Sequence, residues 1–499
     1  AFALRVTLAR LAKRTLDVQY YIWDDDTTGK LLIYRLLEAA RRGVKVRMLL
    51  DHANQLGRDV KWAALDAHPN IEVRLFNPFK GRYKYFLQWL YHAPLLNHRM
   101  HNKAWIMDGE RALVGGRNIA DHYFGVNAST NFRDLDLYAH GAIVADTRSA
   151  FDAFWQSPLA VPMKSYRRRT EVTAERIWRW LGRWRTSLKG YPYLFPQHEA
   201  FFTEYLRKQE QQCVQAPAAL LFDSPDKASG AKQTLMGEQL ARLLGRKDHR
   251  ELLMEASYFI PGEAFVEAMA GFRQRGGRAA VLTNSLATND VIAAHGAYSR
   301  YRPGLLAAGV ELHELQPNAR ALRRQVRLFK GRSQASLHTK AMVLDRREVF
   351  VGSFNIDPRS VHLNTEMGYY VASAELGQQV AAFIEEGLEV AVLERVLQSM
   401  AAAAREAGVA IVTGDTKVVP RGQGGGIYFA TTGIAQAVNP IPLGLDQIQH
   451  GDKVLVSGTV GDHGTTVLLA REAFGLEGDL KSDSACVLPI TEALMKLKG

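Results

Sequence analysis

The chain has 499 residues, 47% hydrophobic and 23% charged, which are the proportions of an ordinary globular protein and exclude a fibrous or disordered chain. The two cysteines, Cys213 and Cys486, lie far apart, which argues against a disulfide framework or a zinc site. The sequence contains no run of 18 apolar residues, so it predicts no membrane-spanning helix. The length predicts two or three domains.

The positive charge is concentrated in the first 400 residues. Residues 401–499 contain 8 basic and 10 acidic residues, which leaves 55 basic and 41 acidic residues, a net charge of +14, in residues 1–400. A basic body favours an anionic partner, either nucleic acid or a membrane rich in acidic lipid, with simple solubility as the alternative. The chain starts at Ala1 within a patterned segment and without a signal peptide, so we expect that its natural N-terminus is missing.

Alternating and amphipathic patterns predict a strand–helix–strand unit that occurs twice. The expected elements are a helix end at 7–15, a strand at 16–23, a helix at 29–42 and a strand at 44–51, then a strand at 256–260, a helix at 262–275 and a strand at 278–284. A right-handed crossover makes the two strands of each unit parallel. The repetition predicts two α/β lobes, each built on a mixed sheet.

An eight-residue pattern, H-x-K-x4-D, also occurs twice. The first copy runs from His101 to Asp108 and the second from His338 to Asp345, 237 residues later. Each is followed by a Val-Gly pair and then by an asparagine 17 residues beyond the histidine, namely Asn118 and Asn355. A single copy of so short a pattern carries little weight, whereas two copies with the same sequence downstream indicate a duplication.

The spacing of the pattern has a chemical reason. If each octet enters a buried strand, residues i and i+2 share a face, so His101 lies with Lys103 and His338 with Lys340. Asp108 and Asp345 have the opposite parity and sit at a turn, which favours a supporting role over direct chemistry. Two facing His–Lys pairs supply a nucleophile, a general acid and two fixed positive charges.

The duplicated pattern resembles the phospholipase D superfamily over roughly residues 1–385. The resemblance implies an α/β fold of two pseudo-symmetric lobes in which one histidine attacks phosphorus and the other protonates the departing alcohol, without a metal or other cofactor. It further implies that lysines and asparagines hold anionic oxygens. The implied catalytic residues are His101, Lys103, Asp108, His338, Lys340 and Asp345, with phosphate-binding or supporting roles for Asn118, Asn355 and Ser353.

An acidic residue beyond each asparagine is expected to orient the imidazoles. Residues 131–136 align with residues 364–366, and in the superfamily an acidic residue here fixes the tautomer of a catalytic histidine. Asp134 and Glu366 are therefore the predicted orienting pair, the alternative being that either pairs with a surface arginine. The symmetric pattern does not say which histidine is the nucleophile, although we favour His101.

Two segments interleave basic and aromatic residues, 82–91 and 176–185, the second after the arginines at 167–169. Such segments suit the headgroup layer of a bilayer. The alternatives are a buried helix with a basic edge and, for the second segment, stacking on single-stranded nucleic acid.

Further resemblance to bacterial cardiolipin synthases comes from residues 222–227 and 357–360. It implies a phosphatidyltransferase that moves phosphatidyl from phosphatidylglycerol to a second lipid alcohol, peripheral on the cytoplasmic face of the bacterial inner membrane. A phosphodiesterase acting on nucleic acid and an inactive fusion are the alternatives.

The character of the sequence changes near residue 385. Residues 393–408 predict an amphipathic helix, and the segments at 409–419, 451–458 and 461–464 resemble a hydrogenase maturation factor, a carbamoyl dehydratase that uses ATP. That resemblance implies Mg-ATP contacts by Asp415 and Lys417, and hydrogenase maturation proteins as partners if the tail is functional. Parts of that family's nucleotide site and its cysteine tail are missing, which favours a rearranged reading frame or recent fusion, with a structural appendage as the alternative.

The expected organisation has four parts. They are a first lobe at 1–160, a basic and aromatic helical connection at 161–215, a second lobe at 216–385 and a partial α+β segment at 386–499.

Overall fold

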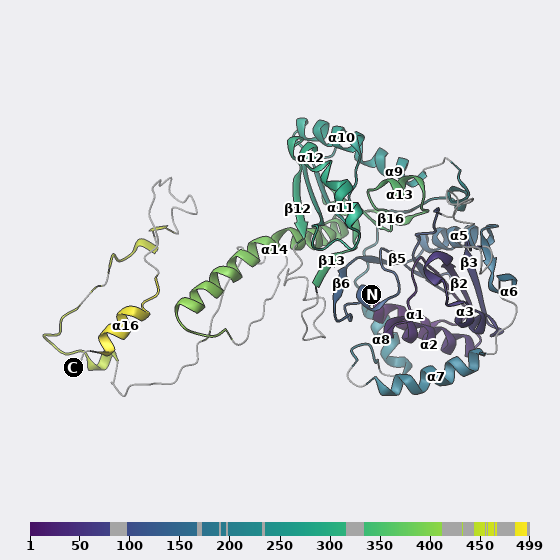
Figure 1. The fold of residues 1–499 in the computed structure, drawn as a ribbon, viewed down its shortest axis with the longest axis horizontal. Coiled ribbons are helices and arrows are strands. Elements are labelled where there is room, and N and C mark those ends of the chain that lie inside the picture. Colours follow the sequence, from purple (N-terminus) through teal and green to yellow (C-terminus); the bar gives the residue numbers. More distant parts are fainter. Residues whose placement is uncertain are drawn as a thin grey trace. The chain divides into compact units, whose positions relative to one another are not determined.

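The computed structural model describes residues 1–79, 97–166, 172–188, 191–195, 198–231, 235–315, 334–411, 432, 444–454, 456, 458–463, 465–466 and 485–496 (Figure 1). The chain divides into two compact units, Ala1–Ala391 and Val392–Gly499. The first unit contains both predicted lobes, and the candidate site lies entirely within it.

The first lobe is built on a seven-stranded mixed sheet in the order β7-β5-β4-β1-β2-β3-β8. Its strands are β1 (Thr15–Tyr20), β2 (Lys45–Asp51), β3 (Ile71–Phe76), β4 (Ala104–Met107), β5 (Arg111–Gly115), β7 (Asp136–His140) and β8 (Ala160–Pro162). Strands β1, β2 and β3 are parallel, and β4 pairs antiparallel with β1. The helix between β1 and β2 gives the predicted parallel pair.

The second lobe repeats this arrangement in the order β12-β11-β10-β14-β15-β16-β9. Its strands are β9 (Ala218–Phe222), β10 (Glu251–Ala256), β11 (Arg278–Asn284), β12 (Glu311–Leu315), β14 (Lys340–Leu344), β15 (Glu348–Gly352) and β16 (Met367–Ala372). Strand β10 pairs parallel with β11 and antiparallel with β14, as β1 does with β2 and β4. The prediction of two pseudo-symmetric α/β lobes is confirmed.

Helices cover both sheets. In the first lobe they are α1 (Phe2–Leu11), α2 (Thr27–Arg41), α3 (Asp59–Asp66), α5 (Ile143–Gln156), α6 (Met163–Tyr166), α7 (Ala174–Ser187) and α8 (Glu199–Glu210). In the second lobe they are α9 (Leu235–Leu244), α10 (Glu263–Gln274), α11 (Ile292–Ser299), α12 (Arg302–Ala307), α13 (Pro358–His362) and α14 (Ala374–Glu406). Short 3-10 turns lie at His52–Gln55, Asp121–Tyr123, Pro225–Ser229 and Leu445–Gln447, and α16 (Leu488–Met495) lies in the second unit.

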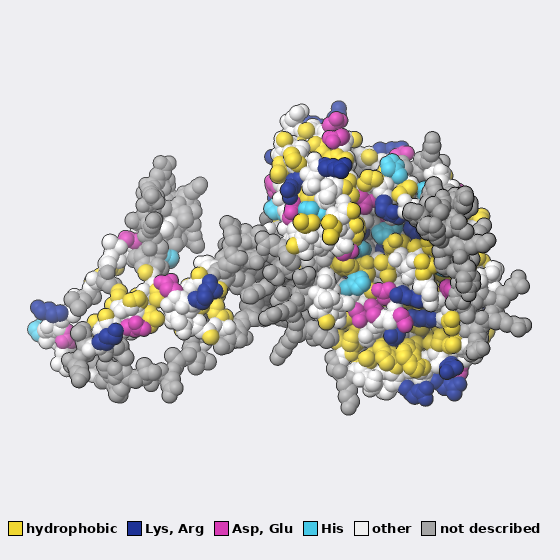
Figure 2. All heavy atoms as spheres, in the orientation of Figure 1, with side chains coloured by type: hydrophobic (Ala, Val, Ile, Leu, Met, Phe, Trp, Pro, Cys, Tyr) yellow, Lys and Arg dark blue, Asp and Glu magenta, His cyan; other side chains and the backbone are white. Residues whose placement is uncertain are grey.

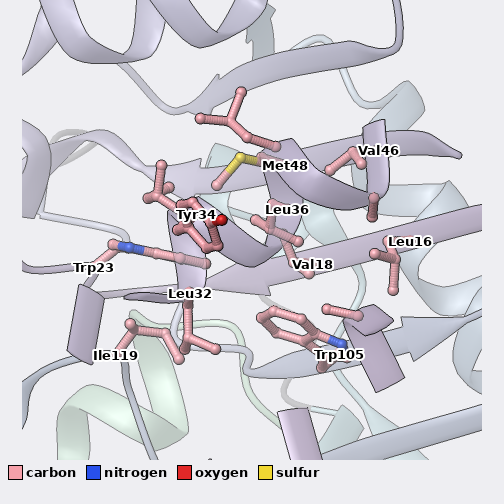
Figure 3. Packing of buried hydrophobic residues seen from close by; sticks show 14 of the residues in the cluster. Leu16, Val18, Trp23, Leu32, Tyr34, Leu36, Val46, Met48, Trp105 and Ile119 are labelled. Atoms are coloured by element: carbon pink, nitrogen blue, oxygen red, sulfur yellow. The ribbon is translucent and has the colours of Figure 1, made fainter. Parts of the chain in front are cut away.

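The alternation along β1 explains how the first core forms. Leu16, Val18 and Tyr20 are fully buried on one face of the sheet, where they pack with residues of α2, β2 and β4 (Figure 3). Burying a side chain of this size stabilises a fold by about 1.5–3 kcal/mol, so this face largely fixes the register of the strand. Asp17, on the opposite face, is buried against Arg47 (2.7 Å).

Two sequence predictions about elements need correction. The strand expected at 256–260 is β10, which ends at Ala256, so Ser257 and Tyr258 follow the strand. The reason is that Leu252, Leu253 and Met254 are the apolar residues that the sheet buries. The helix expected from 393 is the end of α14, which begins at Ala374 and continues across the expected boundary at 385.

The two lobes are joined by backbone hydrogen bonds as well as by apolar packing. A third, two-stranded parallel sheet pairs β6 (Thr130–Arg133) of the first lobe with β13 (Gln334–Leu337) of the second. An apolar cluster shared by the lobes includes Ile106 of β4 and Met367 of β16. The strand pair ends directly before His338, so it fixes that residue against the first lobe.

Among the described residues, no helix combines the length and the apolar character needed to span a bilayer. Within the expected α+β tail, the longer stretches outside the described residues are 412–431, 433–443 and 467–484.

Candidate active site

Both histidines lie just before a strand rather than on it, which corrects the expectation that strand parity pairs them with their lysines. Strand β4 begins at Ala104 and β14 at Lys340. The backbone N–H of His101 donates to the carbonyl of Thr365 (2.9 Å), and that of His338 donates to the carbonyl of Arg133 (2.8 Å). Each histidine is therefore held by the backbone of the opposite lobe, because its own sheet has not yet begun.

The imidazole of His101 contacts a carboxylate of the second lobe. Its Nδ1 lies 2.8 Å from Glu366 Oε2, and Glu366 is fully buried. Glu366 Oε1 accepts a hydrogen bond from Ser360 (2.8 Å), and Oε2 accepts a short one from Ser353. A carboxylate with three donors is stabilised in its ionised form.

His338 has the reciprocal arrangement. Its Nδ1 lies 2.7 Å from Oδ2 of Asp134, which belongs to the first lobe. Asp134 Oδ1 accepts from the backbone N–H of Leu135 (2.7 Å). The predicted orienting residues thus do contact the imidazoles, but each carboxylate serves the histidine of the other lobe.

The two lysines are buried beside their histidines. Lys103 Nζ donates to the carbonyl of His101, and Lys340 Nζ donates to the carbonyl of His338 and to Ser257 Oγ (3.0 Å). Lys340 Nζ also lies 3.0 Å from His338 Nδ1. The lysines of both lobes influence both histidines, since the charge of Lys340 lowers the pKa of His101 and that of Lys103 lowers the pKa of His338.

The predicted phosphate-supporting residues have different surroundings. Asn118 Oδ1 accepts from the backbone N–H of Ile22 (3.1 Å), and Asn355 Oδ1 accepts from Ser257 Oγ (3.0 Å). The hydroxyl of Ser353 donates to Glu366, so its contact is with the orienting carboxylate.

The counterpart of Ser353 in the first lobe is Gly116, where a Cβ would lie 2.2 Å from Oδ1 of Asp134. The carboxylate of Asp134 therefore requires glycine at that position.

Asp108 and Asp345 lie at turns away from the imidazoles. Asp108 accepts hydrogen bonds from the backbone N–H groups of Lys13, Arg14 and Thr15 (2.7–3.0 Å). Asp345 accepts from the backbone N–H groups of Arg250 (2.8 Å) and Glu251 (2.7 Å) and contacts His249 (3.0 Å). Both carboxylates therefore hold the chain end that leads into the central strand of their lobe, β1 or β10, as a supporting role requires.

The electrostatics of the two imidazole–carboxylate pairs differ. Burial lowers the pKa of His101 to about 4. Burial opposes ionisation of Glu366, but its hydrogen bond to His101 and the charge of Lys103 lower the pKa of its carboxyl group. At the other pair burial raises the pKa of Asp134 to about 7, and burial together with Lys340 keeps the pKa of His338 well below its ordinary value. The pseudo-symmetric halves are thus chemically unequal.

Sequence reasoning missed an aromatic shell around the imidazoles. The Tyr21 ring lies edge-on to His101 (5.0 Å between centroids), and Phe132 stacks on His338 (5.3 Å). The Tyr123 hydroxyl accepts from Asn118 Nδ2 (2.9 Å) and lies 3.5 Å from His338 Nε2. Tyr21 follows β1 closely and so lies past the carboxyl end of a parallel strand, a position that could have indicated its place.

Sequence reasoning also missed a buried ion pair behind Glu366, although the pair lies in the segment 222–227 that resembles cardiolipin synthases. Lys227 Nζ lies 2.7 Å from Asp223 Oδ2 and donates to the carbonyl of Ser360 (2.8 Å). Asp223 Oδ2 also accepts from the backbone N–H of Glu366 (3.1 Å). The pair therefore fixes both Glu366 and a serine that donates to it.

Of the two basic and aromatic segments, 82–91 lies outside the described residues and 176–185 lies on α7. Leu181 is buried, whereas Arg179, Trp180 and Arg183 are exposed. Lys and Arg side chains gather over this helix (Figure 2). Contact of this face with lipid phosphates remains a prediction, and Asp415 and Lys417 of the tail also lie outside the described residues.

Comparison with protein families identifies the two-lobed part of the chain. The model of the cardiolipin synthase, phospholipase D-like domain matches residues 6–155 and 246–387. The chain belongs to this family. A relative from Escherichia coli K12, cardiolipin synthase C, is 41% identical over 391 residues, which cover 76% of this chain and 81% of that protein.

A solved structure shares the fold of this family member. The phosphatidylserine synthase of Haemophilus influenzae superposes with a TM-score of 0.51 at 16% identity, covering 78% of this chain and 83% of that one. The similarity supports the two-lobe architecture, and at this identity it concerns the fold alone.

The tail matches a different family, so the chain is a fusion. The N-terminal domain of AIR synthase related proteins matches residues 372–437. The carbamoyl dehydratase HypE of Azotobacter vinelandii is 49% identical over 116 residues, 23% of this chain. The chain spans only about a third, 34%, of that relative's length.

Proposed function

We propose that the protein is a phosphatidyltransferase that moves phosphatidyl from phosphatidylglycerol to a second lipid alcohol and releases glycerol. The observation that carries the proposal is the pair of buried imidazoles, each bonded through Nδ1 to a carboxylate of the opposite lobe. With Nδ1 so engaged, Nε2 of each ring is the nitrogen available to a phosphodiester. Membership of the cardiolipin synthase family supports the choice of a lipid phosphodiester.

His101 is the nucleophile in this proposal. Glu366 has a lowered pKa and accepts three hydrogen bonds, so it is ionised. Its carboxylate accepts a hydrogen bond from Nδ1–H of His101. The lone pair of His101 therefore lies on Nε2. Because its pKa is about 4, the ring is uncharged at neutral pH and ready to attack phosphorus.

His338 and Asp134 together form the general acid. In this proposal Asp134, whose pKa is raised to about 7, is protonated and donates to His338 Nδ1 (2.7 Å), so the ring carries its own proton on Nε2. Lys340 Nζ lies 3.0 Å from the same Nδ1, and because an ammonium group only donates, its position favours the same tautomer. Asp134 thus supplies a replacement proton to Nδ1 when Nε2 releases its own.

The two half-reactions balance on these groups. His101 Nε2 bonds to phosphorus as the phosphorus–oxygen bond to glycerol breaks, and the glycerol oxygen takes the Nε2 proton of His338. In the second step the acceptor alcohol gives its proton to His338 Nε2 while Nδ1 returns its proton to Asp134. The alcohol oxygen bonds to phosphorus, and the phosphorus–nitrogen bond breaks. Lys103 and Lys340, both buried, stabilise the charge on the phosphoryl oxygens.

The setting we propose is the cytoplasmic face of a bacterial inner membrane, with phosphatidylglycerol as the anionic partner of the basic body. We also propose that the transfer uses these side chains without a metal or organic cofactor. Activity that persists after exhaustive chelation would support this, whereas activity lost on chelation and restored by Mg²⁺ would contradict it.

Nucleotide binding by the tail and contact with hydrogenase maturation proteins are separate proposals. Protection from unfolding by Mg-ATP would support the first of them.

The test is lipid turnover by three forms of the full chain on phosphatidylglycerol vesicles. We expect wild type to form the two-phosphate lipid and glycerol, and His101→Ala and His338→Ala each to abolish formation of the two-phosphate lipid. Lys208→Ala, which removes an exposed side chain of α8 whose ion-pair partner is the exposed Glu204, is the control and should leave turnover unchanged. Full turnover by either histidine variant, or cleavage of single-stranded DNA without lipid turnover, would overturn the proposal.

A further inference from the structure

The second lobe presents a row of exposed aliphatic side chains beside the candidate active site. They lie on the segment from Leu286 to Ala293, which follows β11 and enters α11. Leu286 is 58% exposed, Val291 43% and Ile292 73%. Large exposed aliphatic side chains grouped on one short segment mark a candidate interaction surface.

This segment is fixed in place rather than loosely attached. Thr288 is buried and its hydroxyl donates to the carbonyl of Leu315 (3.3 Å). Asn289 Oδ1 accepts from the backbone N–H of Val291 (2.9 Å), and Asp290 accepts from the Tyr258 hydroxyl (2.7 Å). These bonds hold the aliphatic side chains outward, although folding ordinarily favours their burial.

The segment is tied to the groups around His338. Asn284, the last residue of β11, donates to the carbonyls of Ser257 (3.1 Å) and Leu337 (2.9 Å), and Leu337 directly precedes His338. Ser257 in turn contacts Lys340. The aliphatic row begins two residues after Asn284, so it borders the reaction centre.

The first lobe carries an exposed aliphatic side chain at the equivalent place. Strand β2 is the counterpart of β11, and Leu56, on the loop that follows β2, is 45% exposed. Loops after both equivalent strands lie at the edge of the sheets where the imidazoles are located. Each lobe therefore carries exposed aliphatic side chains on the loop that follows this strand.

We propose that the Leu286–Ala293 segment is a membrane-docking lip, which enters the acyl-chain layer of a phospholipid surface next to the site. The inference rests on the proposed function, because a substrate phosphorus at the headgroup level reaches His101 only if the protein sits close against the bilayer. Branched aliphatic side chains favour the acyl layer, and the net charge of +14 on residues 1–400 complements anionic headgroups. A second copy of this chain is the competing occupant.

The test compares a lip variant with a matched control. The lip variant is Leu286→Ser, Val291→Ser and Ile292→Ser together. The control is Leu306→Ser, which removes a side chain of 55% exposure from α12 of the same lobe. Leu306 shortly precedes β12, whose first residue pairs with Ala280 near the start of β11, so it lies at the opposite end of the sheet.

Two readouts separate the explanations. We expect the lip variant to lose at least about tenfold in partition onto phosphatidylglycerol vesicles and in turnover of those vesicles, while turnover of short-chain phosphatidylglycerol dispersed as monomers stays within about twofold. The control should match wild type in all three measurements. Unchanged vesicle partition, an equal loss on monomeric substrate, or a change only in oligomeric state by light scattering would each overturn the proposal.

The vesicle-partition arm requires no turnover, so it remains decisive if the proposed reaction is wrong. Failure of wild type to act on phosphatidylglycerol in either form would contradict the proposed function and leave the lip tested by partition alone.

Discussion

Replacing Glu366 by Gln separates the charge of this side chain from its shape. The amide retains an oxygen that His101 Nδ1–H can reach, so the tautomer and the ring position are kept. The negative charge is lost at a group that is fully buried and 2.8 Å from the ring nitrogen. That charge matters most when Nε2 bonds to phosphorus, because the ring then becomes positive.

The size of the effect follows from the geometry. With about 4 Å between the charge centres and an effective dielectric constant of about 20, the lost interaction is about 4 kcal/mol. Each 1.4 kcal/mol changes the rate about tenfold, so we expect the first half-reaction to slow by about 10³-fold with little change in substrate affinity.

The assay is a single-turnover quench with phosphatidylglycerol, which measures the rate at which glycerol is released. Ser187→Ala, at the exposed end of α7, is the control for the effect of preparing a variant, and its rate of glycerol release should equal that of wild type. A Glu366→Gln rate within about threefold of wild type would refute the reasoning, because that result would mean that the carboxylate holds the ring but does not stabilise its charge.

Three further predictions concern pH, stability and the tail. Since the pKa of His101 is about 4 and that of Asp134 about 7, the single-turnover rate of glycerol release should be highest between about pH 5 and 6. It should fall below that range as His101 is protonated, and fall as the pH rises through 7 because Asp134 ionises, a decline that Asp134→Asn should lack. In urea, Lys227→Met should lower the free energy of unfolding by about 3–5 kcal/mol because Asp223 is left buried without its cation, and adding Asp223→Asn should restore about half; an unchanged midpoint would contradict this. A chain ending at residue 391 should keep lipid turnover within about twofold, since both imidazole–carboxylate pairs lie in Ala1–Ala391, and loss of turnover in a folded truncated chain would count against it.

Most of the fold could be predicted from the duplication in the sequence. Two octets and two strand–helix–strand units predicted two α/β lobes, and both mixed sheets are present with the expected parallel pairs. Apolar alternation placed β11 at Arg278–Asn284 to the residue, but it placed β10 too late. The error arose because Ser257, Tyr258 and Phe259 follow the strand with side chains of strand-like composition.

The identities of the site residues could be predicted, but their pairing could not. Aligning Asp134 with Glu366 marks equivalent positions in the two lobes, whereas the contact each makes depends on how the lobes face each other. That arrangement is set by the β6–β13 pair and by the backbone bonds of His101 and His338 to the opposite lobe. Contacts of this kind join residues far apart in sequence and leave no local pattern.

The inequality of the two halves also depends on packing. Ser353 and Gly116 occupy equivalent positions, and the sequence shows that they differ but not that one donates to Glu366 while the other makes room for Asp134. Lys227 and Asp223 are four residues apart, a spacing typical of any exposed helical pair, so only their burial indicates that they fix Glu366.

The most direct test of the central claim, that two imidazoles from opposite lobes act on one phosphorus, is to locate the covalent intermediate. Phosphatidylglycerol labelled at its phosphorus would be mixed with enzyme, quenched within a turnover, and the labelled residue found by peptide mass spectrometry under alkaline conditions. We predict label on His101 in wild type, none in His101→Ala, and slow labelling of His101 in His338→Ala. Label on any other residue, or equal labelling of His101→Ala, would contradict the account.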